Sequence, residues 1–285
     1  MAIKSISQFQ YNQAQRYLRK AIKLDPGNVN LLLIHGTVLF QIGQVKEAVA
    51  IFKNAHEIDP ENVEIMNSLA LAMAENGDSE KAIQLMLYVI SKSKKGRYYN
   101  NMSLILMNAA DGKQTNENYY CSLFETAIQY VDSAISAGAS PEFSINKGNY
   151  YYLLKDTAKA NEYFRQFRSP YTLNNMAIFN SHEENKSSSL DLIEEAVNLS
   201  GNNVCPIINN NRKLLSNGYS YLSNSKLQFI YLYQIMPAIL PSTHVFSYSF
   251  AMGLEKPVYN SIGYYYYNSL DIKPHQDLKC KLASS

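Results

Sequence analysis

The sequence predicts an all-α fold in which antiparallel pairs of helices stack side by side into a solenoid. The first observation is a period of 34 residues, which separates Pro26 from Pro60 and Gly43 from Gly77. The second is that small residues keep the same period; the alanines that do so are Ala14, Ala48 and Ala82, and Ala21 and Ala55. Self-similarity at a fixed period of this length is typical of repeat architectures.

Each period reads as two helices joined by a turn. Residues 28–43 carry apolar side chains at helical spacing and end at Gly43, and glycine adopts the left-handed conformation past a helix end at little cost. Residues 44–58 form the return helix. That helix has to stop before Pro60, because proline lacks an amide donor and restricts the residue before it. We expect Asp59 to cap the following helix, with Pro60 in its first turn.

The alanines of the return helix have a packing role. Ala48, Phe52 and Ala55 lie at i, i+4 and i+7, so they share one face. Two helices approach to about 8–10 Å only when the residues at their contact are small. We therefore expect Ala48 and Ala55 to permit a close approach, with Phe52 filling the space between them. His35 falls on the core-facing side of the first helix and is expected to be a packed histidine.

This pattern resembles the tetratricopeptide repeat family, whose motif has small residues at positions 8, 20 and 27, a bulky residue at 24 and a proline at 32. The second unit matches all five positions, with Gly36, Ala48, Phe52, Ala55 and Pro60. The third unit matches less well: it supplies Ala70, Ala82 and the bulky Met86, but it has Val89 at the last small position and no proline. The resemblance implies a right-handed superhelical solenoid of about seven to eight units, of which the later ones are degenerate.

The match to the motif divides the chain into three parts. Residues 1–94 form well-matched units, the first of them truncated. Residues 95–236 form degenerate units, with an insertion near 108–118. Residues 237–285 are expected to form degenerate terminal helices and a tail. A separate helical cap over the last 80 residues is the alternative.

Composition argues for an intracellular, cytoplasmic protein. The formal net charge of +2 gives no electrostatic case for binding nucleic acid or a membrane surface. There is no apolar signal segment at the start and no apolar run of the roughly 20 residues that a membrane span needs. Cys121, Cys205 and Cys280 are odd in number and far apart, which predicts a reducing compartment without disulfide bonds or a zinc site.

No pattern of catalytic or metal-binding residues is visible. The five histidines are scattered without an HExxH motif, and the glycines form no phosphate-binding loop. We therefore predict a protein that is not an enzyme and that needs no cofactor or metal.

An asparagine series gives the strongest indication of function. The resemblance implies that the first helix of each unit lines a concave groove, with position 6 pointing into it. Counting along the units places Asn101, Asn146, Asn175 and Asn209 at that position. A carboxamide both donates and accepts hydrogen bonds, so such a series suits the backbone of an extended peptide. Asparagine is also abundant in this chain, which leaves open that the series reflects composition alone. Further groove residues are proposed to add selectivity: Tyr150, Tyr171 and Arg212.

The sequence therefore predicts a scaffold that binds a peptide or helix of a partner protein in its concave groove. Two alternatives remain at this point. One is a structural subunit of a large complex, held by its edges and convex face. The other is the substrate-reading subunit of an enzyme whose catalytic part lies on another chain. The sequence does not predict the oligomeric state.

Overall fold

The computed structural model describes residues 1–7, 10–111, 117–138, 143–154, 156–182, 185–201, 204 and 206–218, together with three short strands farther on. These residues form thirteen helices that follow one another in pairs. The pairs are α1 (Ala2–Ser7) and α2 (Tyr11–Leu24), α3 (Val29–Gln41) and α4 (Val45–Ile58), α5 (Val63–Glu75) and α6 (Ser79–Lys92), α7 (Gly96–Asp111) and α8 (Glu117–Ser136), α9 (Ser144–Leu153) and α10 (Thr157–Gln166), α11 (Pro170–His182) and α12 (Lys186–Ser200), followed by α13 (Pro206–Ser216) alone.

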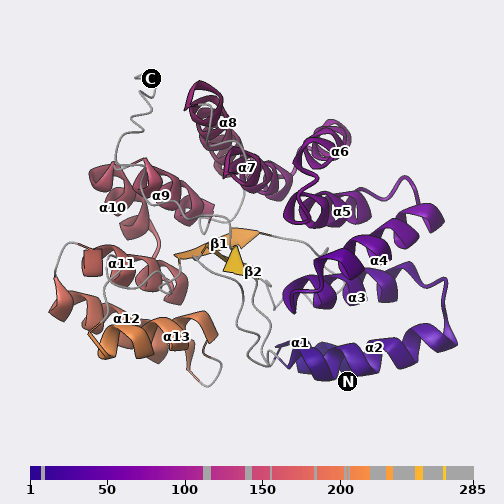
Figure 1. The fold of residues 1–285 in the computed structure, drawn as a ribbon, viewed down its shortest axis with the longest axis horizontal. Helices are drawn as coiled ribbons and strands as arrows, with labels where there is room; N and C mark the ends of the chain where they lie inside the picture. The colour runs from indigo at the N-terminus through magenta and orange to yellow at the C-terminus, as the bar shows by residue number, and fades with distance from the viewer. Residues whose placement is uncertain are drawn as a thin grey trace.

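The pairs are arranged along an arc that bends the array around a central space (Figure 1). The two helices of each pair pack against each other, and the second helix of each pair packs against the first helix of the next. In addition, α3 contacts α5, α5 contacts α7, and α11 contacts α13, and side-chain hydrogen bonds join α9 to α7 and to α11, so the first helices form an inner layer. We call α3, α5, α7, α9, α11 and α13 the inner helices. The predicted helical solenoid is thus confirmed.

The contact between small and bulky residues is as predicted. Ala48, Phe52 and Ala55 are fully buried on α4. A Cβ atom added to Gly36 on α3 would lie 2.5 Å from Cε1 of Phe52, so only glycine fits beneath that ring. Gly148 and Phe164 repeat the arrangement between α9 and α10, at 2.6 Å. Ala70 and Ala82 are likewise fully buried between α5 and α6.

The joints between units differ from the prediction in one respect. Asn62, rather than Asp59, caps α5: its side-chain oxygen accepts hydrogen bonds from the amides of Glu64 and Ile65. Asp59 ends α4 instead, and its Oδ2 accepts a hydrogen bond of 2.9 Å from Nδ2 of Asn62. Pro60 lies in the exposed turn between them and not in the first turn of α5.

The same joint occurs one period earlier. Asn28 caps α3 by accepting a hydrogen bond from the amide of Leu31, and its Nδ2 donates to Oδ2 of Asp25 at 2.9 Å. Aspartate and asparagine both serve as helix caps, so the Asp-Pro-x-Asn sequence offers two candidates. The structure uses both residues, one at each side of the turn.

The described residues beyond α13 form strands where helices were predicted. They are β1 (Phe229–Tyr233), β2 (Tyr248–Met252) and β3 (Tyr266–Tyr267). β1 and β2 pair antiparallel, with Phe229 opposite Met252, and β3 pairs parallel to β2. β1 falls within the range predicted to hold degenerate helical units, and the other two fall in the predicted terminal helices. The β1 sequence FIYLY is short, aromatic and β-branched, which favours a strand.

The small sheet lies inside the arc of helices (Figure 1), and β1 packs against the inner helices α7, α9 and α11. An extended segment of the chain therefore crosses three successive units on their concave side.

Two further expectations concern the cysteines and the membrane. Cys121 on α8 is disulfide-bonded, contrary to the prediction of free thiols, and the other two cysteines lie outside the described residues. Within the described part of the chain, the helices are too short or too polar to cross a membrane.

His35 is buried as predicted, and it leads to a testable pH dependence. Neither ring nitrogen has a hydrogen-bond partner among the described residues. Burial, aided by the nearby charge of Arg19, lowers the pKa of His35 to about 4. Below pH 6.5, His35 is therefore protonated in the unfolded chain but stays neutral in the folded chain. The free energy of unfolding consequently decreases as the pH falls from 6.5 towards 4.

We expect His35 to lower the free energy of unfolding by about 2 kcal/mol between pH 7 and pH 5. The variant His35→Leu removes this contribution. Urea titrations of both proteins at several pH values measure the difference. Parallel pH profiles for the two proteins would contradict the assignment.

Candidate functional site

The inner helices are joined by hydrogen bonds between asparagine side chains. Each pair of neighbouring inner helices from α5 to α13 is bridged by one amide-to-amide bond of 2.7–2.9 Å. In chain order, Asn101 donates to Asn67, Asn146 to Asn100, Asn175 to Asn149, and Asn211 to Asn174. Asn174 also donates to Asn175, at 3.1 Å. We call these eight residues the asparagine network.

All eight side chains are buried. A buried polar group is costly unless it is hydrogen-bonded, so the bonds from helix to helix stabilise the array and fix the register of its units. A carboxamide carries two hydrogens and an oxygen with two lone pairs. Each network residue can therefore take part in more than one hydrogen bond, and the network lines up groups of the kind that pair with a peptide unit.

The structure brings three of the four predicted asparagines together in this network. Asn101, Asn146 and Asn175 belong to it, whereas Asn209 is exposed on α13 and lies outside it. Asn211, two residues farther on, occupies the expected place. In the run of three asparagines at 209–211, counting along the sequence did not establish which one occupies position 6 of the last unit. The other five members of the asparagine network were thus not predicted from the sequence.

The other predicted groove residues lie elsewhere or on the margin. Tyr150 is fully buried, its hydroxyl is 3.0 Å from Oγ of Ser103, and its ring meets that of Phe124 on α8 edge to face. It is therefore a packing residue within the array. Arg212 is exposed on α13 and its Nε donates to Glu194 of α12, which turns it towards the outer layer. Tyr171, in the first turn of α11, is half-buried against the core.

A charged cluster that was not predicted from the sequence lies at the amino-terminal ends of helices α5 and α7. Arg97 on α7 is ion-paired with Glu64 on α5, and the Tyr98 hydroxyl donates to the same Glu64 oxygen at 2.7 Å. The Arg97 guanidinium also lies over the Tyr98 ring, 4.9 Å from its centroid. Burial raises the pKa of Tyr98, so its hydroxyl remains a proton donor. The carboxylate of Glu64 is thus already neutralised within the protein.

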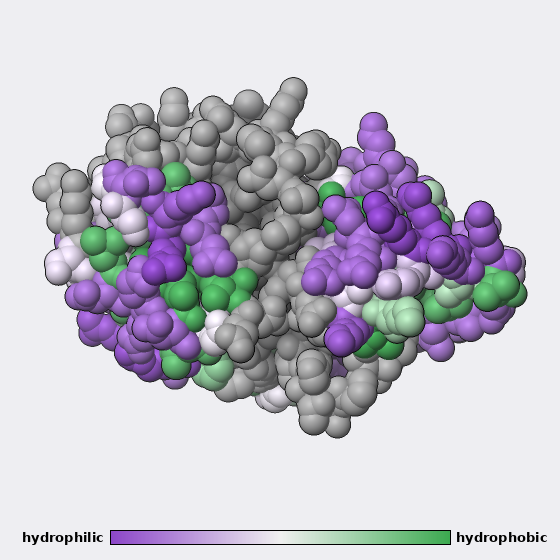
Figure 2. All heavy atoms as spheres, turned by 90° about the horizontal axis from the view of Figure 1, so that it is seen from below, coloured by the Kyte–Doolittle hydropathy of each residue, from purple (hydrophilic) through white to green (hydrophobic). Residues whose placement is uncertain are grey.

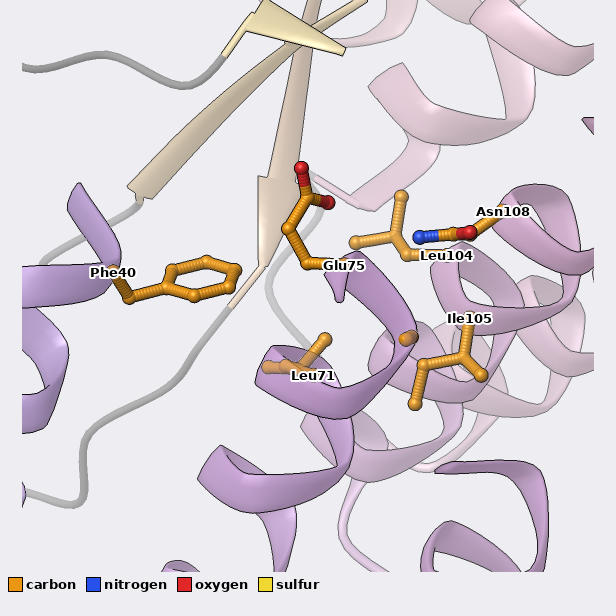
Figure 3. A pocket seen from close by; sticks show the side chains of 7 residues that line it. Phe40, Leu71, Glu75, Leu104, Ile105 and Asn108 are labelled. Carbon is orange, nitrogen blue, oxygen red and sulfur yellow. The ribbon is translucent and has the colours of Figure 1, made fainter. Parts of the chain in front are cut away.

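At the opposite end of α5, a small recess opens between three inner helices. Its walls come from Phe40 of α3, Leu71, Ala74 and Glu75 of α5, and Leu104, Ile105 and Asn108 of α7 (Figure 3). The space within it that a water-sized sphere can occupy is about 20 Å³, which is room for about one water-sized group and far below the ~300–1,000 Å³ of most small-molecule sites. We call it the Glu75 recess. Burial raises the pKa of Glu75 well above its ordinary value.

The second helices of the pairs, which form the outer layer, carry no comparable candidate binding feature among the described residues. Their exposed large apolar side chains are scattered at one or two per helix, as for Leu24, Ile58 and Leu199. Seen from below, the described surface over both ends of the array is largely hydrophilic, with apolar residues in small groups (Figure 2). The polar network, the recess and the contact with β1 all lie on the inner helices instead.

Comparison with known proteins agrees with this architecture. The tetratricopeptide repeat family model matches residues 5–51 and 39–100. A TPR repeat-containing protein of Methanocaldococcus jannaschii is 22% identical over 120 residues, which cover 42% of this chain and 21% of that protein. The matched region thus spans about a fifth of the length of this curated relative.

Two solved structures share the fold. A thermophilic TPR protein of Thermus thermophilus superposes with a TM-score of 0.59 at 15% identity, over 66% of this chain and 99% of that one. PilW, a type IV pilus biogenesis factor, superposes with a TM-score of 0.51 at 16% identity, over 70% of this chain and 90% of that one. The resemblance to tetratricopeptide repeats inferred from Gly36, Ala48, Phe52, Ala55 and Pro60 is confirmed.

Proposed function

We propose that this chain is a non-catalytic scaffold that binds an extended polypeptide on its inner helices. Residues 5–100 match the tetratricopeptide repeat family model, and such repeats generally mediate protein–protein interaction. One observation carries the proposal. β1 is an extended segment, and it packs against α7, α9 and α11 on the concave side of the array (Figure 1). The inner face thus already accommodates a polypeptide in the conformation that a bound partner segment would adopt.

The chemistry of those helices supports the same proposal. α7, α9 and α11 carry six of the eight residues of the asparagine network. Carboxamides recognise the peptide backbone irrespective of side chain, and each such bond contributes about 0.5–1.5 kcal/mol net. We therefore propose modest affinity and broad selectivity for the groove. Asn101, Asn146 and Asn175 are fully buried in the structure, and we propose that they reach the partner when it takes the place of β1 on α7, α9 and α11. Tyr171, half-buried at the start of α11, is proposed to add selectivity.

A peptide-binding experiment on the full chain tests this function. Replacing Ile230 and Leu232 with proline removes two backbone donors from β1, and proline disrupts a strand ladder. A fluorescent peptide with the sequence of Leu227–Gln234 is then titrated into the double variant and into the unaltered protein. We expect the variant to bind the peptide saturably, whereas a scrambled peptide of the same composition does not bind.

The unaltered protein should bind the same peptide much more weakly, because its own segment competes. A tethered segment acts at an effective concentration of about 1 mM. If the free peptide binds the variant at roughly 10 μM, the competition weakens its binding to the unaltered chain by about a hundredfold. Equal binding to both proteins, or binding to neither, would contradict a peptide groove on the inner helices. A stable stoichiometric complex of the chain that is indifferent to the β1 substitutions would instead favour the assembly-subunit alternative.

A further inference from the structure

The Glu75 recess holds a carboxylate that the fold itself does not explain. Glu75 is the last residue of α5, where the helix dipole is negative and disfavours another negative charge. Its Oε2 atom is buried, and it has no hydrogen-bond partner in the described part of the chain. The side chain points away from the axis of α5, with Leu71 and Leu104 beside it (Figure 3).

The other partly buried glutamate of the same helix gives a direct comparison. Glu64, at the first turn of α5, is ion-paired with Arg97 and accepts a hydrogen bond from Tyr98 through its Oε1 atom, although its Oε2 is likewise buried without a hydrogen-bond partner among the described residues. Among the described residues, no lysine or arginine lies within 4.0 Å of Glu75. Within the described part of the chain, helix α5 thus carries one glutamate that pairs with a cation, Glu64, and one that does not, Glu75. Burial without a cation favours the uncharged form of the Glu75 carboxyl, and a cation brought beside it would favour the charged form.

The shape and lining of the recess indicate the kind of partner. Its walls are mostly apolar, from Phe40, Leu71, Ala74, Leu104 and Ile105, and the Asn108 amide lies at the side. Lysine and arginine combine an aliphatic stem with a cationic end, and the stem packs against apolar surface while the charge reaches a polar group. The recess has room for about one water-sized group, such as the cationic end of the side chain, while the stem lies over the apolar walls.

We propose that the Glu75 recess binds the cationic end of a lysine or arginine side chain of the extended partner. The inference rests on the proposed function, because the recess lies on the inner helices α3, α5 and α7, and α7 is also one of the helices that β1 contacts. It adds to that function a preference for a basic residue at one place along the bound segment. In this proposal the asparagine network hydrogen-bonds to the backbone of the partner segment, and Glu75 pairs with one of its basic side chains.

The test uses n-butylammonium as the probe and the full chain with glutamate labelled by ¹³C at the side-chain carboxyl. We expect n-butylammonium to shift the Glu75 carboxyl resonance saturably and to lower the pKa of that group, because the bound cation favours the ionised form. Binding should therefore strengthen as the pH rises through the elevated pKa. Neutral n-butanol, which has the same stem, should bind about tenfold more weakly or not at all.

Two variants complete the design. Glu75→Gln keeps the size of the side chain and removes its charge, and it should reduce n-butylammonium binding by about tenfold or more. Glu80→Gln removes an exposed carboxylate from the neighbouring α6 and should leave binding unchanged. Because burial already favours the uncharged carboxyl, which glutamine resembles in shape, Glu75→Gln should also melt no lower than the unaltered protein at neutral pH.

Equal binding of the ammonium and the alcohol would overturn the proposal, as would a Glu75 resonance that does not respond to the amine. Either result leaves the titration of the β1 peptide unaffected. Conversely, a failure of that peptide to bind, with n-butylammonium still selective for Glu75, would contradict the peptide groove while leaving the cation site in place. The two proposals are therefore separable.

Discussion

Replacing Phe52 with alanine is expected to lower the free energy of unfolding by about 3–5 kcal/mol, the cost of removing a buried aromatic side chain and leaving a cavity. Phe52 is completely buried, and its ring lies where a side chain on Gly36 would otherwise stand. The ring therefore fills the space that glycine leaves between α3 and α4. Chemical denaturation followed by circular dichroism measures the loss.

The geometry supplies the controls for this prediction. Ile58→Ala removes an apolar side chain that is 46% exposed at the end of the same helix, and it should change stability by no more than about 0.5 kcal/mol. Gly36→Ala alone should cost about 1–3 kcal/mol, because its Cβ would lie 2.5 Å from the ring. The same substitution in the Phe52→Ala background should cost nothing or stabilise, since the added methyl group enters the cavity. Simple additivity of the two substitutions would contradict the contact.

The second large effect is expected at Asn174, which takes part in two bonds of the asparagine network. It accepts a hydrogen bond of 2.8 Å from Asn211 and donates one of 3.1 Å to Asn175. Asn174→Ala severs both bonds in a buried setting, where each lost bond costs about 1–3 kcal/mol. We expect a loss of stability together with weaker protection of the α11 and α13 amides in hydrogen exchange.

Two neighbouring asparagines on α13 calibrate this result. Asn211→Ala severs one of the two bonds, so its effect should be intermediate. Asn209→Ala changes the same residue type two positions away, on the exposed side of the helix, and should be close to neutral. If all three alanine variants are equally stable, the amide bonds between helices contribute nothing to the array.

The parts of the fold that sequence predicts are those set by local packing. The 34-residue spacing of Ala48 and Ala82 reports a contact that recurs with the same geometry, and a turn glycine such as Gly43 needs the left-handed conformation it is found in. These requirements act within one pair of helices, so they leave a regular trace. The exchange of roles between Asp59 and Asn62 shows the limit: both residue types cap helices, and only the path of the turn decides between them.

Features that depend on more distant contacts were missed. Asn100, Asn149 and Asn174 lie next to or near the predicted positions, but they point to a different neighbouring helix, and a count along one helix does not distinguish such directions. β1 was assigned to a helical unit because the repeat was extended past α13, although the aromatic and β-branched residues of FIYLY favour a strand. Glu75 looks like an ordinary surface glutamate in the sequence, since only the meeting of α3, α5 and α7 buries it.

The joint made by Asp59 and Asn62 has a consequence for how such a chain changes its length. The hydrogen bonds of that joint are made by residues 55–66. Thirty-four residues earlier, Asn28 likewise donates to Asp25 and accepts from the amides of Leu31 and Leu32. The boundary is therefore self-contained, and a block of DNA encoding one period can be duplicated or excised between two such boundaries while each junction is regenerated intact. The length of partner segment that the array can contact would then change by whole units, and no new joint between units would be needed.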